Sequence, residues 1–407
     1  MPNGTVLAYG MLGLPLAFGA LPVYVHLPRY YAETTGMGLA LLGILLFGAR
    51  LLDALVDPWL GALADRLPRR RMLAFALPVF AAGFMALFNP PARGAVPWLL
   101  GSLTLTYLGF SAATVAYQAW GAAVGVDSNE RTRLAAAREG FGLLGVVLAA
   151  ALPGVLAQDL SVGTERLSWL LPPLLVCAAW AGFSRVGPGA GSPGAADPVA
   201  PGIRRVLSDG AFRRLLAVFI VNGLAAALPA TLFLFFVADV LAADSASAVL
   251  LALYFVAGAA SMPVWVRLAA RFGRVRAWAL AMVLAMAAFA GTSLLGKGDV
   301  AAFAGICLLS GLALGADLAL PVAMAADLGE RLGRTGACFG VWNFVAKLNL
   351  ALAAGLALPL LDLSGYRPGG NAGHGALIFA YALMPLGYKL LAATMLWRWR
   401  DSLEIRP

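Results

Sequence analysis

Charged residues are scarce in this sequence, and their scarcity excludes an ordinary soluble fold. Asp, Glu, Lys and Arg together make up 12% of the 407 residues, about half of the ~25% of an average globular domain. Hydrophobic residues make up 61%, and the mean hydropathy is +0.84. Apolar runs of about 20 residues recur along the chain, each long enough to cross a ~30 Å hydrocarbon core. We therefore expect an all-α polytopic membrane protein.

Cysteine is also rare, which argues against disulfide and metal frameworks. Cys177, Cys307 and Cys338 are isolated from one another and lie in or next to apolar runs. Their spacing matches no zinc motif, so we expect them to pack as small apolar residues. The first apolar run is of full length and lacks a basic n-region and a small-residue cleavage site, so we expect a membrane helix there and no cleavable signal peptide.

The apolar runs predict twelve transmembrane helices in two groups of six. The first group covers 7–28, 37–60, 72–90, 95–124, 135–157 and 167–184. The second group covers 214–238, 246–268, 277–296, 300–325, 337–361 and 376–397. Between them, 185–213 is rich in Gly, Pro and Ala and predicts a flexible cytoplasmic linker. The expected domains are an N-terminal six-helix lobe (1–184), this linker, and a C-terminal six-helix lobe (214–407).

Arginine clusters predict the orientation in the membrane. They occur in every second loop and at the C-terminal end, whereas the alternate loops carry only scattered basic residues. The clusters are Arg66 with Arg69, Arg70 and Arg71; Arg131 with Arg133; Arg204 and Arg205 with Arg213 and Arg214; Arg271 with Arg274 and Arg276; Arg331 with Arg334; and Arg398 with Arg400. Because basic loops stay in the cytoplasm, we expect both termini there, in a bacterial-type inner (plasma) membrane. The same loops account for the net charge of +9, so we expect no nucleic-acid partner.

The two halves of the sequence resemble each other after their second spans. The segment 61–71 (GALADRLPRRR) and the segment 266–276 (VRLAARFGRVR) both lead from small residues into an Arg-rich turn. Parallel repeats of this kind are typical of two-lobed transporters, whose site lies between the lobes near the membrane midplane. The sequence therefore predicts two pseudo-symmetric lobes.

One predicted helix carries three charges on one face. Arg50, Asp53 and Asp57 lie three and four residues apart within 37–60. Each carboxylate at the centre of a membrane helix costs about 2.5–3.5 kcal/mol on insertion scales, and two carboxylates one turn apart repel each other. The pair therefore requires a cation, which could be Na⁺, a proton or the Arg50 side chain. We predict that Asp53 and Asp57 bind a coupling cation; the alternative is that Arg50 neutralises Asp53 while water solvates Asp57.

Two motifs resemble known transporters. Gly61-x-x-x-Asp65-Arg66-x-x-Arg69-Arg70 is similar to the loop 2–3 motif of the major facilitator superfamily. The segment 49–61 (ARLLDALVDPWLG) resembles the second helix of the glycoside–pentoside–hexuronide:cation symporters, the melibiose-permease group. Single-residue matches along the chain are Tyr9, Gly10, Tyr30, Tyr31, Trp120, Arg138, Asp327 and Lys347.

The resemblance implies the major facilitator fold and a cation site. In that family, two carboxylates of the second helix bind Na⁺, Li⁺ or H⁺, which here would be Asp53 and Asp57. The loop residues Asp65, Arg66, Arg69 and Arg70 would form inside-face contacts that stabilise the outward-open state. The family's sugar site uses acidic residues in the first and fourth helices. Ala17 and Ala116 stand at those positions here and Leu16 replaces the adjacent lysine, which argues against a galactoside substrate.

Polar residues inside the spans predict a cavity for a small solute. The candidate substrate-binding residues are Tyr117, Gln118, Trp120, Arg138, Asn222, Trp342, Asn343 and Lys347. Asp317 lies deep in the span 300–325 and needs a cationic partner. We expect Lys347 either to pair with Asp317 or to reach Asp53 or Asp57. His26, at the end of the first span, is either a substrate or proton ligand or an interfacial group.

These features predict a secondary transporter rather than an enzyme. We expect symport of a small organic solute, such as a sugar, with Na⁺ or H⁺ by alternating access, no cofactor beyond the coupling cation, and a monomer whose partners are membrane lipid and a small-molecule substrate. A copper importer of the same superfamily would carry Met and His pairs in the seventh and eighth helices, where only Met262 is present. An intramembrane prenyltransferase would need a second aspartate-rich motif besides Asp53-x-x-x-Asp57. A non-transporting receptor is supported only by the absence of the sugar carboxylates.

Overall fold

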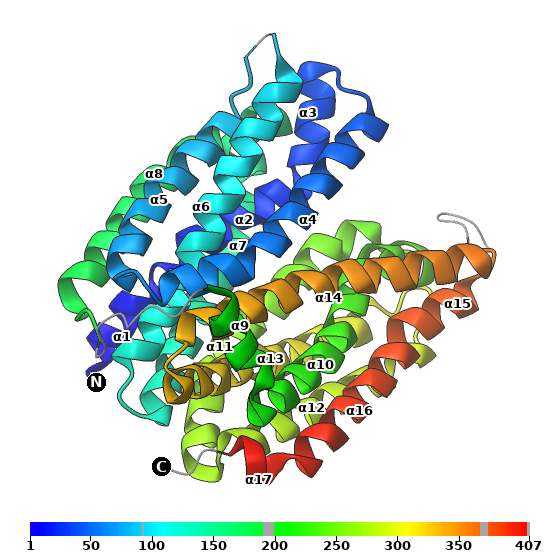
Figure 1. Cartoon of the computed structure of the whole chain (residues 1–407). Coiled ribbons are helices and arrows are strands. Elements are labelled where there is room, and N and C mark those ends of the chain that lie inside the picture. The colour runs from blue at the N-terminus through cyan, green and yellow to red at the C-terminus, as the bar shows by residue number, and fades with distance from the viewer. Residues whose placement is uncertain (92, 190–198, 367–372, 405–407) are drawn as a thin grey trace. The chain divides into compact units, whose positions relative to one another are not determined.

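The computed structural model describes residues 1–91, 93–189, 199–366 and 373–404, and this part of the chain contains helices and no strand (Figure 1). Eleven of its helical segments are long and apolar enough to cross a membrane. The remaining predicted span corresponds to α4 (Leu39–Ala64), which carries Arg50, Asp53 and Asp57 and is not among the eleven. The predicted all-α polytopic fold is confirmed.

Two compact units make up the structure. Unit 1 comprises Met1–Val206 together with Ala325–Phe344, and unit 2 comprises Leu207–Met324 together with Val345–Pro407. The end of α13 (Val300–Leu332) and the start of α14 (Thr335–Leu363) therefore belong to unit 1, although they lie in the second half of the sequence.

The first 189 residues of unit 1 follow the predicted spans closely. Their helices are α1 (Asn3–Gly10), α2 (Gly13–Val25), α3 (Leu27–Thr35), α4, α5 (Arg69–Leu87), α6 (Ala95–Val124), α7 (Ser128–Leu156) and α8 (Leu160–Arg185). The first predicted span, 7–28, is interrupted around residue 11 and again at His26, two residues before Pro28. Pro28 has no backbone N–H to donate to the carbonyl group four residues earlier, and it fits the first turn of a new helix, α3. α7 begins seven residues earlier than its apolar run because the Asp127 carboxylate accepts a 2.7 Å hydrogen bond from the Glu130 N–H and caps the helix.

Helices α5, α6 and α8 run side by side in unit 1 (Figure 1). Glycine allows α5 and α6 to approach until their backbones touch. A Cβ atom on Gly109 would lie 2.4 Å from the Phe80 backbone nitrogen, and one on Gly83 would lie 2.5 Å from that of Thr106. Phe80 and Phe84 are fully buried beside these glycines. The contact therefore depends on residues without a side chain.

Replacing Gly109 by alanine is expected to destabilise unit 1 by about 1–3 kcal/mol, because the new methyl group would push α6 away from α5. Gly101 lies on the same helix with open space around its Cα. Its replacement by alanine should be neutral or slightly stabilising, because alanine favours helix. Thermal denaturation of the two purified variants in the same detergent measures the difference, and equal denaturation temperatures would contradict the close contact.

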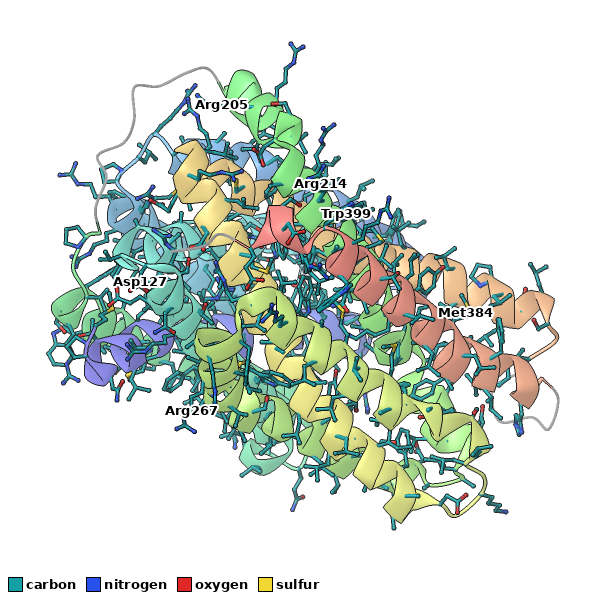
Figure 2. The ribbon with its side chains drawn as sticks, turned by 90° about the horizontal axis from the view of Figure 1, so that it is seen from below. Asp127, Arg205, Arg214, Arg267, Met384 and Trp399 are labelled. Atoms are coloured by element: carbon teal, nitrogen blue, oxygen red, sulfur yellow. The ribbon has the colours of Figure 1, made fainter. Side chains whose placement is uncertain are left out.

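The segment 185–213, which was predicted to be a flexible linker, contains a helix. α9 (Val199–Ser208) lies within it, and residues 190–198 lie outside the described part of the chain. Unit 2 then continues with α10 (Gly210–Phe235), η1 (Phe236–Val240), η2 (Asp244–Ala246), α11 (Ser247–Phe272), α12 (Arg274–Ala290), η3 (Thr292–Leu294), most of α13 and α14, α15 (His374–Ile378), η4 (Phe379–Leu383), α16 (Met384–Arg398) and α17 (Arg400–Leu403). Figure 2 shows Arg214 of α10 and Trp399, between α16 and α17, at the same end of this unit.

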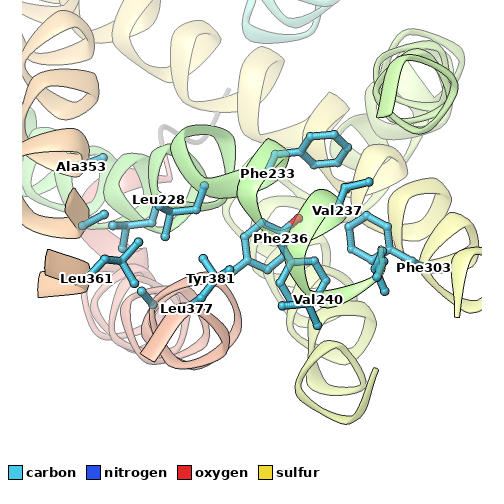
Figure 3. Close-up of a cluster of buried hydrophobic side chains, with 14 of the residues drawn as sticks. Leu228, Phe233, Phe236, Val237, Val240, Phe303, Ala353, Leu361, Leu377 and Tyr381 are labelled. Carbon is cyan, nitrogen blue, oxygen red and sulfur yellow. The ribbon is translucent and has the colours of Figure 1, made fainter. Parts of the chain in front are cut away.

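An aromatic core holds the other end of unit 2 together (Figure 3). Phe236 stacks on Tyr381 with ring centroids 4.2 Å apart, and the ring centroid of Phe303 lies 5.4 Å from that of Phe236. Phe236 and Tyr381 lie in the π-helical turns η1 and η4. Such turns insert one residue into a helix and are not visible in a hydropathy pattern. They are the main local difference from the predicted spans 214–238 and 376–397.

Candidate functional site

The two predicted cation ligands are buried in unit 1. Asp53 is 7% exposed and Asp57 is fully buried, whereas Leu52, on the other side of α4, is 65% exposed. The Asp53 carboxylate accepts a 2.7 Å hydrogen bond from the Ser111 hydroxyl on α6. The acidic face of α4 therefore points into the protein, and α6 supplies a further oxygen atom beside it. Ser111 was not predicted, because it is one of several hydroxyl residues in the apolar run 95–124 and nothing in the sequence distinguishes it from the others.

A cation and two phenols surround the same carboxylate. The Arg50 guanidinium lies 4.5 Å from the centroid of the Tyr24 ring, on α2. Tyr24 and Tyr107 both lie close enough to Arg50 and Asp53 to experience their charges. A cation over an aromatic face gains electrostatic stabilisation, so Tyr24 holds the Arg50 head group. Helices α2, α4 and α6 thus build one polar site from carboxylates, hydroxyls and one guanidinium.

Asp65, the first predicted loop residue, caps the start of α14. Its Oδ1 accepts a hydrogen bond from the Gly336 N–H at 2.6 Å and its Oδ2 accepts one from the Ala337 N–H at 3.0 Å. A carboxylate at a helix N-terminus satisfies free N–H groups and interacts favourably with the helix dipole. Burial raises the pKa of the Asp65 carboxyl, and the two N–H donors oppose that rise.

Glycines bring α4 and the start of α14 into backbone contact next to this cap. A Cβ on Gly61 would lie 2.3 Å from the Gly336 carbonyl oxygen, and one on Gly340 would lie 2.5 Å from the Asp57 carbonyl oxygen. The contact therefore extends from the Asp65 cap to the residue that carries the second predicted cation ligand. It lies within unit 1 because the segment Ala325–Phe344 belongs to that unit.

The predicted loop residues Arg66, Arg69 and Arg70 lie in different surroundings. Arg66 is half-buried in the turn after α4, and Arg69 lies 3.7 Å from Glu330 in a partly exposed ion pair. Arg70 donates a 2.7 Å hydrogen bond to the Phe183 carbonyl oxygen. Its guanidinium also lies 5.0 Å from the Phe183 ring centroid and 5.7 Å from that of Trp120. Arg70 therefore joins α5, α6 and α8.

Trp120 and Tyr117, two predicted substrate residues, are engaged in packing within unit 1. The fully buried Trp120 donates a 2.9 Å hydrogen bond to the Gly187 carbonyl oxygen. Tyr117 and Tyr9 each donate their hydroxyl hydrogen to the other's backbone carbonyl oxygen, and their ring centroids lie 4.6 Å apart. These contacts connect α1 to α6 and leave the polar atoms of the aromatic residues occupied.

Other predicted substrate residues form two polar pairs in unit 1. Gln118 accepts a 3.0 Å hydrogen bond from the Asn343 amide. Arg138 is buried and pairs with the neighbouring Glu139. Trp342, the residue before Asn343 in the sequence, is also buried. Arg138 and the Gln118–Asn343 pair therefore offer a guanidinium and amides that could orient a polar solute.

Asp317 has a partner that the sequence analysis did not identify. Its carboxylate pairs with Lys389 of α16, not with Lys347, which is partly buried in the unit 2 part of α14. The Trp278 indole donates to the same carboxylate at 2.8 Å, and the amide of Asn222, a predicted substrate residue, donates to it at 3.2 Å. The signal for Lys389 was available, since a lone lysine within the predicted span 376–397 is costly without a partner.

Comparison with known proteins agrees with this architecture. Residues 6–402 match the family model described as MFS/sugar transport protein. A bacterial homologue of the iron transporter ferroportin, in its outward-facing state, shares 18% identity at a TM-score of 0.71, over 98% of this chain and 100% of that chain. The major facilitator superfamily (MFS) transporter FucP, in the outward conformation, shares 14% identity at a TM-score of 0.75, over 97% of this chain and 98% of the other.

A further solved structure, described as the fucose:proton symporter FucP of E. coli, shares 13% identity at a TM-score of 0.73, over 97% of this chain and 98% of that one. No curated protein sequence matches the chain. At these identities the structural likeness concerns the fold alone.

Proposed function

Because the chain belongs to the MFS/sugar transport protein family, we propose that it couples the movement of a small organic solute to that of Na⁺ or H⁺ bound at Asp53 and Asp57. The family consists of transporters and not enzymes, and the chain is a multi-pass membrane protein. We further propose that it works as a cation symporter, by alternating access of the lobes 1–184 and 214–407, in an inner membrane with both termini in the cytoplasm. The resemblance of segment 49–61 to the glycoside–pentoside–hexuronide:cation symporters supports it.

The observation that carries the proposal is the burial of two carboxylates one turn apart on α4, with the Ser111 hydroxyl on one of them. A buried negative charge is costly unless it is paired. Carboxylate and hydroxyl oxygens are ligands that suit small hard cations, and a proton would neutralise one carboxylate equally well. A site of this composition favours an alkali cation or a proton over a soft metal such as copper.

We infer the chemical class of the solute from the groups that the polar residues of unit 1 can bind. FucP is described as a fucose:proton symporter, but Ala17 and Ala116 stand where the melibiose-permease group has its sugar carboxylates. The amides of Gln118 and Asn343 and the guanidinium of Arg138 recognise carbonyl, hydroxyl or carboxylate groups. We therefore propose a small polar solute other than a galactoside.

A thermal-shift experiment tests the cation site directly. The purified protein is heated in NaCl, LiCl or choline chloride at two pH values. We expect one cation to raise the denaturation temperature in proportion to the logarithm of its concentration, because only the folded state binds it. If the cation is a proton, the dependence on pH replaces the dependence on salt.

Substitutions at the site test whether the rise in denaturation temperature is due to a cation bound at Asp53 and Asp57. The double variant Asp53→Asn/Asp57→Asn should lose the response, and Ser111→Ala should weaken it by about 10-fold in apparent affinity, the value of one hydrogen bond to a charged group. Asp244→Asn, which neutralises an exposed carboxylate in unit 2, should respond like the parent. An unchanged response in the double variant would refute the proposed site.

A further inference from the structure

We propose that Asp317 in unit 2 is a second proton-binding site, in which Lys389 and Asn222 stabilise the two protonation states of its carboxyl group. The site lies in a different unit from Asp53 and Asp57, and it goes beyond the proposed function because it does not depend on a cation at that pair. Four helices contribute to it, namely α10, α12, α13 and α16.

The ionised form of Asp317 is well satisfied. Its Oδ2 accepts from the Lys389 ammonium, and its Oδ1 accepts from both the Trp278 indole and the Asn222 amide. The side chains of Asp317 and Lys389 are 10% and 9% exposed, so neither charge is accommodated by bulk water. Tyr254 on α11 is a further titratable group near Asp317.

Asn222 carries the feature that a purely structural ion pair does not require. It is 3% exposed, and its Oδ1 has no hydrogen-bond partner among the residues that the structure describes. The amide orientation follows from the carboxylate, because only the NH₂ group can donate to it. A buried acceptor without a partner costs about 1–3 kcal/mol, so Asn222 Oδ1 would gain from a nearby donor.

A proton on Asp317 would supply that donor. It would come from a hydronium ion, which leaves water, and bind Asp317 Oδ1. That oxygen would then donate its O–H and could still accept from the Trp278 indole through its remaining lone pair. Rotation of the Asn222 amide by half a turn would then place its Oδ1 as the acceptor of this O–H. Lys389 would still donate to Oδ2, now an uncharged carbonyl oxygen. Asn222 is therefore a positioning residue that can serve both protonation states without movement of the backbone.

Infrared difference spectroscopy of the purified protein in lipid, recorded between an acidic and an alkaline pH, tests the proposal. We expect a band of a protonated carboxyl group that Asp317→Asn removes. Lys389→Met should weaken the pH-dependent band, because it removes the ammonium that stabilises the ionised form of the carboxyl group. Asn222→Leu should move the band to higher frequency, because the protonated group would lose its acceptor.

Three further variants make the result decisive. Asp317→Asn/Lys389→Met leaves no unpaired charge, so it should fold even if Asp317→Asn does not, and it should lack the band. Asp239→Asn, a matched change elsewhere in unit 2, should keep it. The Asp53→Asn/Asp57→Asn variant should also keep it, so a failed cation site would not be mistaken for a failed proton site. If Asp317→Asn/Lys389→Met gives the same difference spectrum as the parent, the ion pair is only structural and the proposal is wrong.

Discussion

Asparagine at both Asp53 and Asp57 is expected to abolish accumulation of the solute against its gradient. The substitution keeps the size of both side chains and an acceptor for the Ser111 hydroxyl, but it removes both negative charges. Because a hydrogen bond or contact to a charged group is worth about 1.5–3 kcal/mol, the loss of two carboxylates should weaken cation binding by about 100-fold or more. Uptake would then no longer follow the cation gradient.

Proteoliposomes loaded with opposing cation and solute gradients provide the measurement. The solute is first identified by screening small polar compounds for those that raise the denaturation temperature of the purified protein. Downhill movement of the solute should persist in the double variant, because the polar groups of Gln118, Asn343 and Arg138 are unchanged. Asp244→Asn serves as the control for the loss of a carboxylate. Accumulation by the double variant at the level of the parent would show that coupling does not use these residues.

Valine in place of Gly340 is expected to destabilise unit 1 by about 3 kcal/mol or more, at the upper end of the usual cost of overpacking. Its Cβ would lie 2.5 Å from the Asp57 carbonyl oxygen and 2.9 Å from the Pro58 Cα. Both are backbone atoms, so no flexible side chain can move aside. Separation of α4 from α14 would also weaken the two hydrogen bonds between Asp65 and the start of α14.

Gly355→Val is the matched control, because Gly355 lies on the same helix with open space around its Cα. The denaturation temperatures and the cation response of the two variants are compared in one detergent. We expect Gly340→Val to lower both, since its new side chain displaces the backbone of Asp57 itself. Equal behaviour of the two variants would contradict the close contact between α4 and α14.

Helix positions and membrane character were predictable because they depend on local composition. The run 95–124 matches α6 residue for residue, since a bilayer requires a continuous apolar segment whose backbone is satisfied internally. The π-helical turns η1 and η4 were not predictable, because one inserted residue leaves the mean hydropathy unchanged. The interruption of the helix at His26 could have been predicted from Pro28, but residues 7–28 were predicted as one continuous span.

The sequence by itself determined that this chain crosses a membrane many times and that α4 carries charges that lipid does not tolerate, because an unpaired carboxylate in hydrocarbon is costly in any fold. Only the tertiary structure decided which groups meet those charges. Ser111 on Asp53, Lys389 on Asp317 and Gly336 on Asp65 come from helices distant in sequence. Hydrogen bonds act over about 3 Å, so such partners depend on how the helices pack, which hydropathy does not encode.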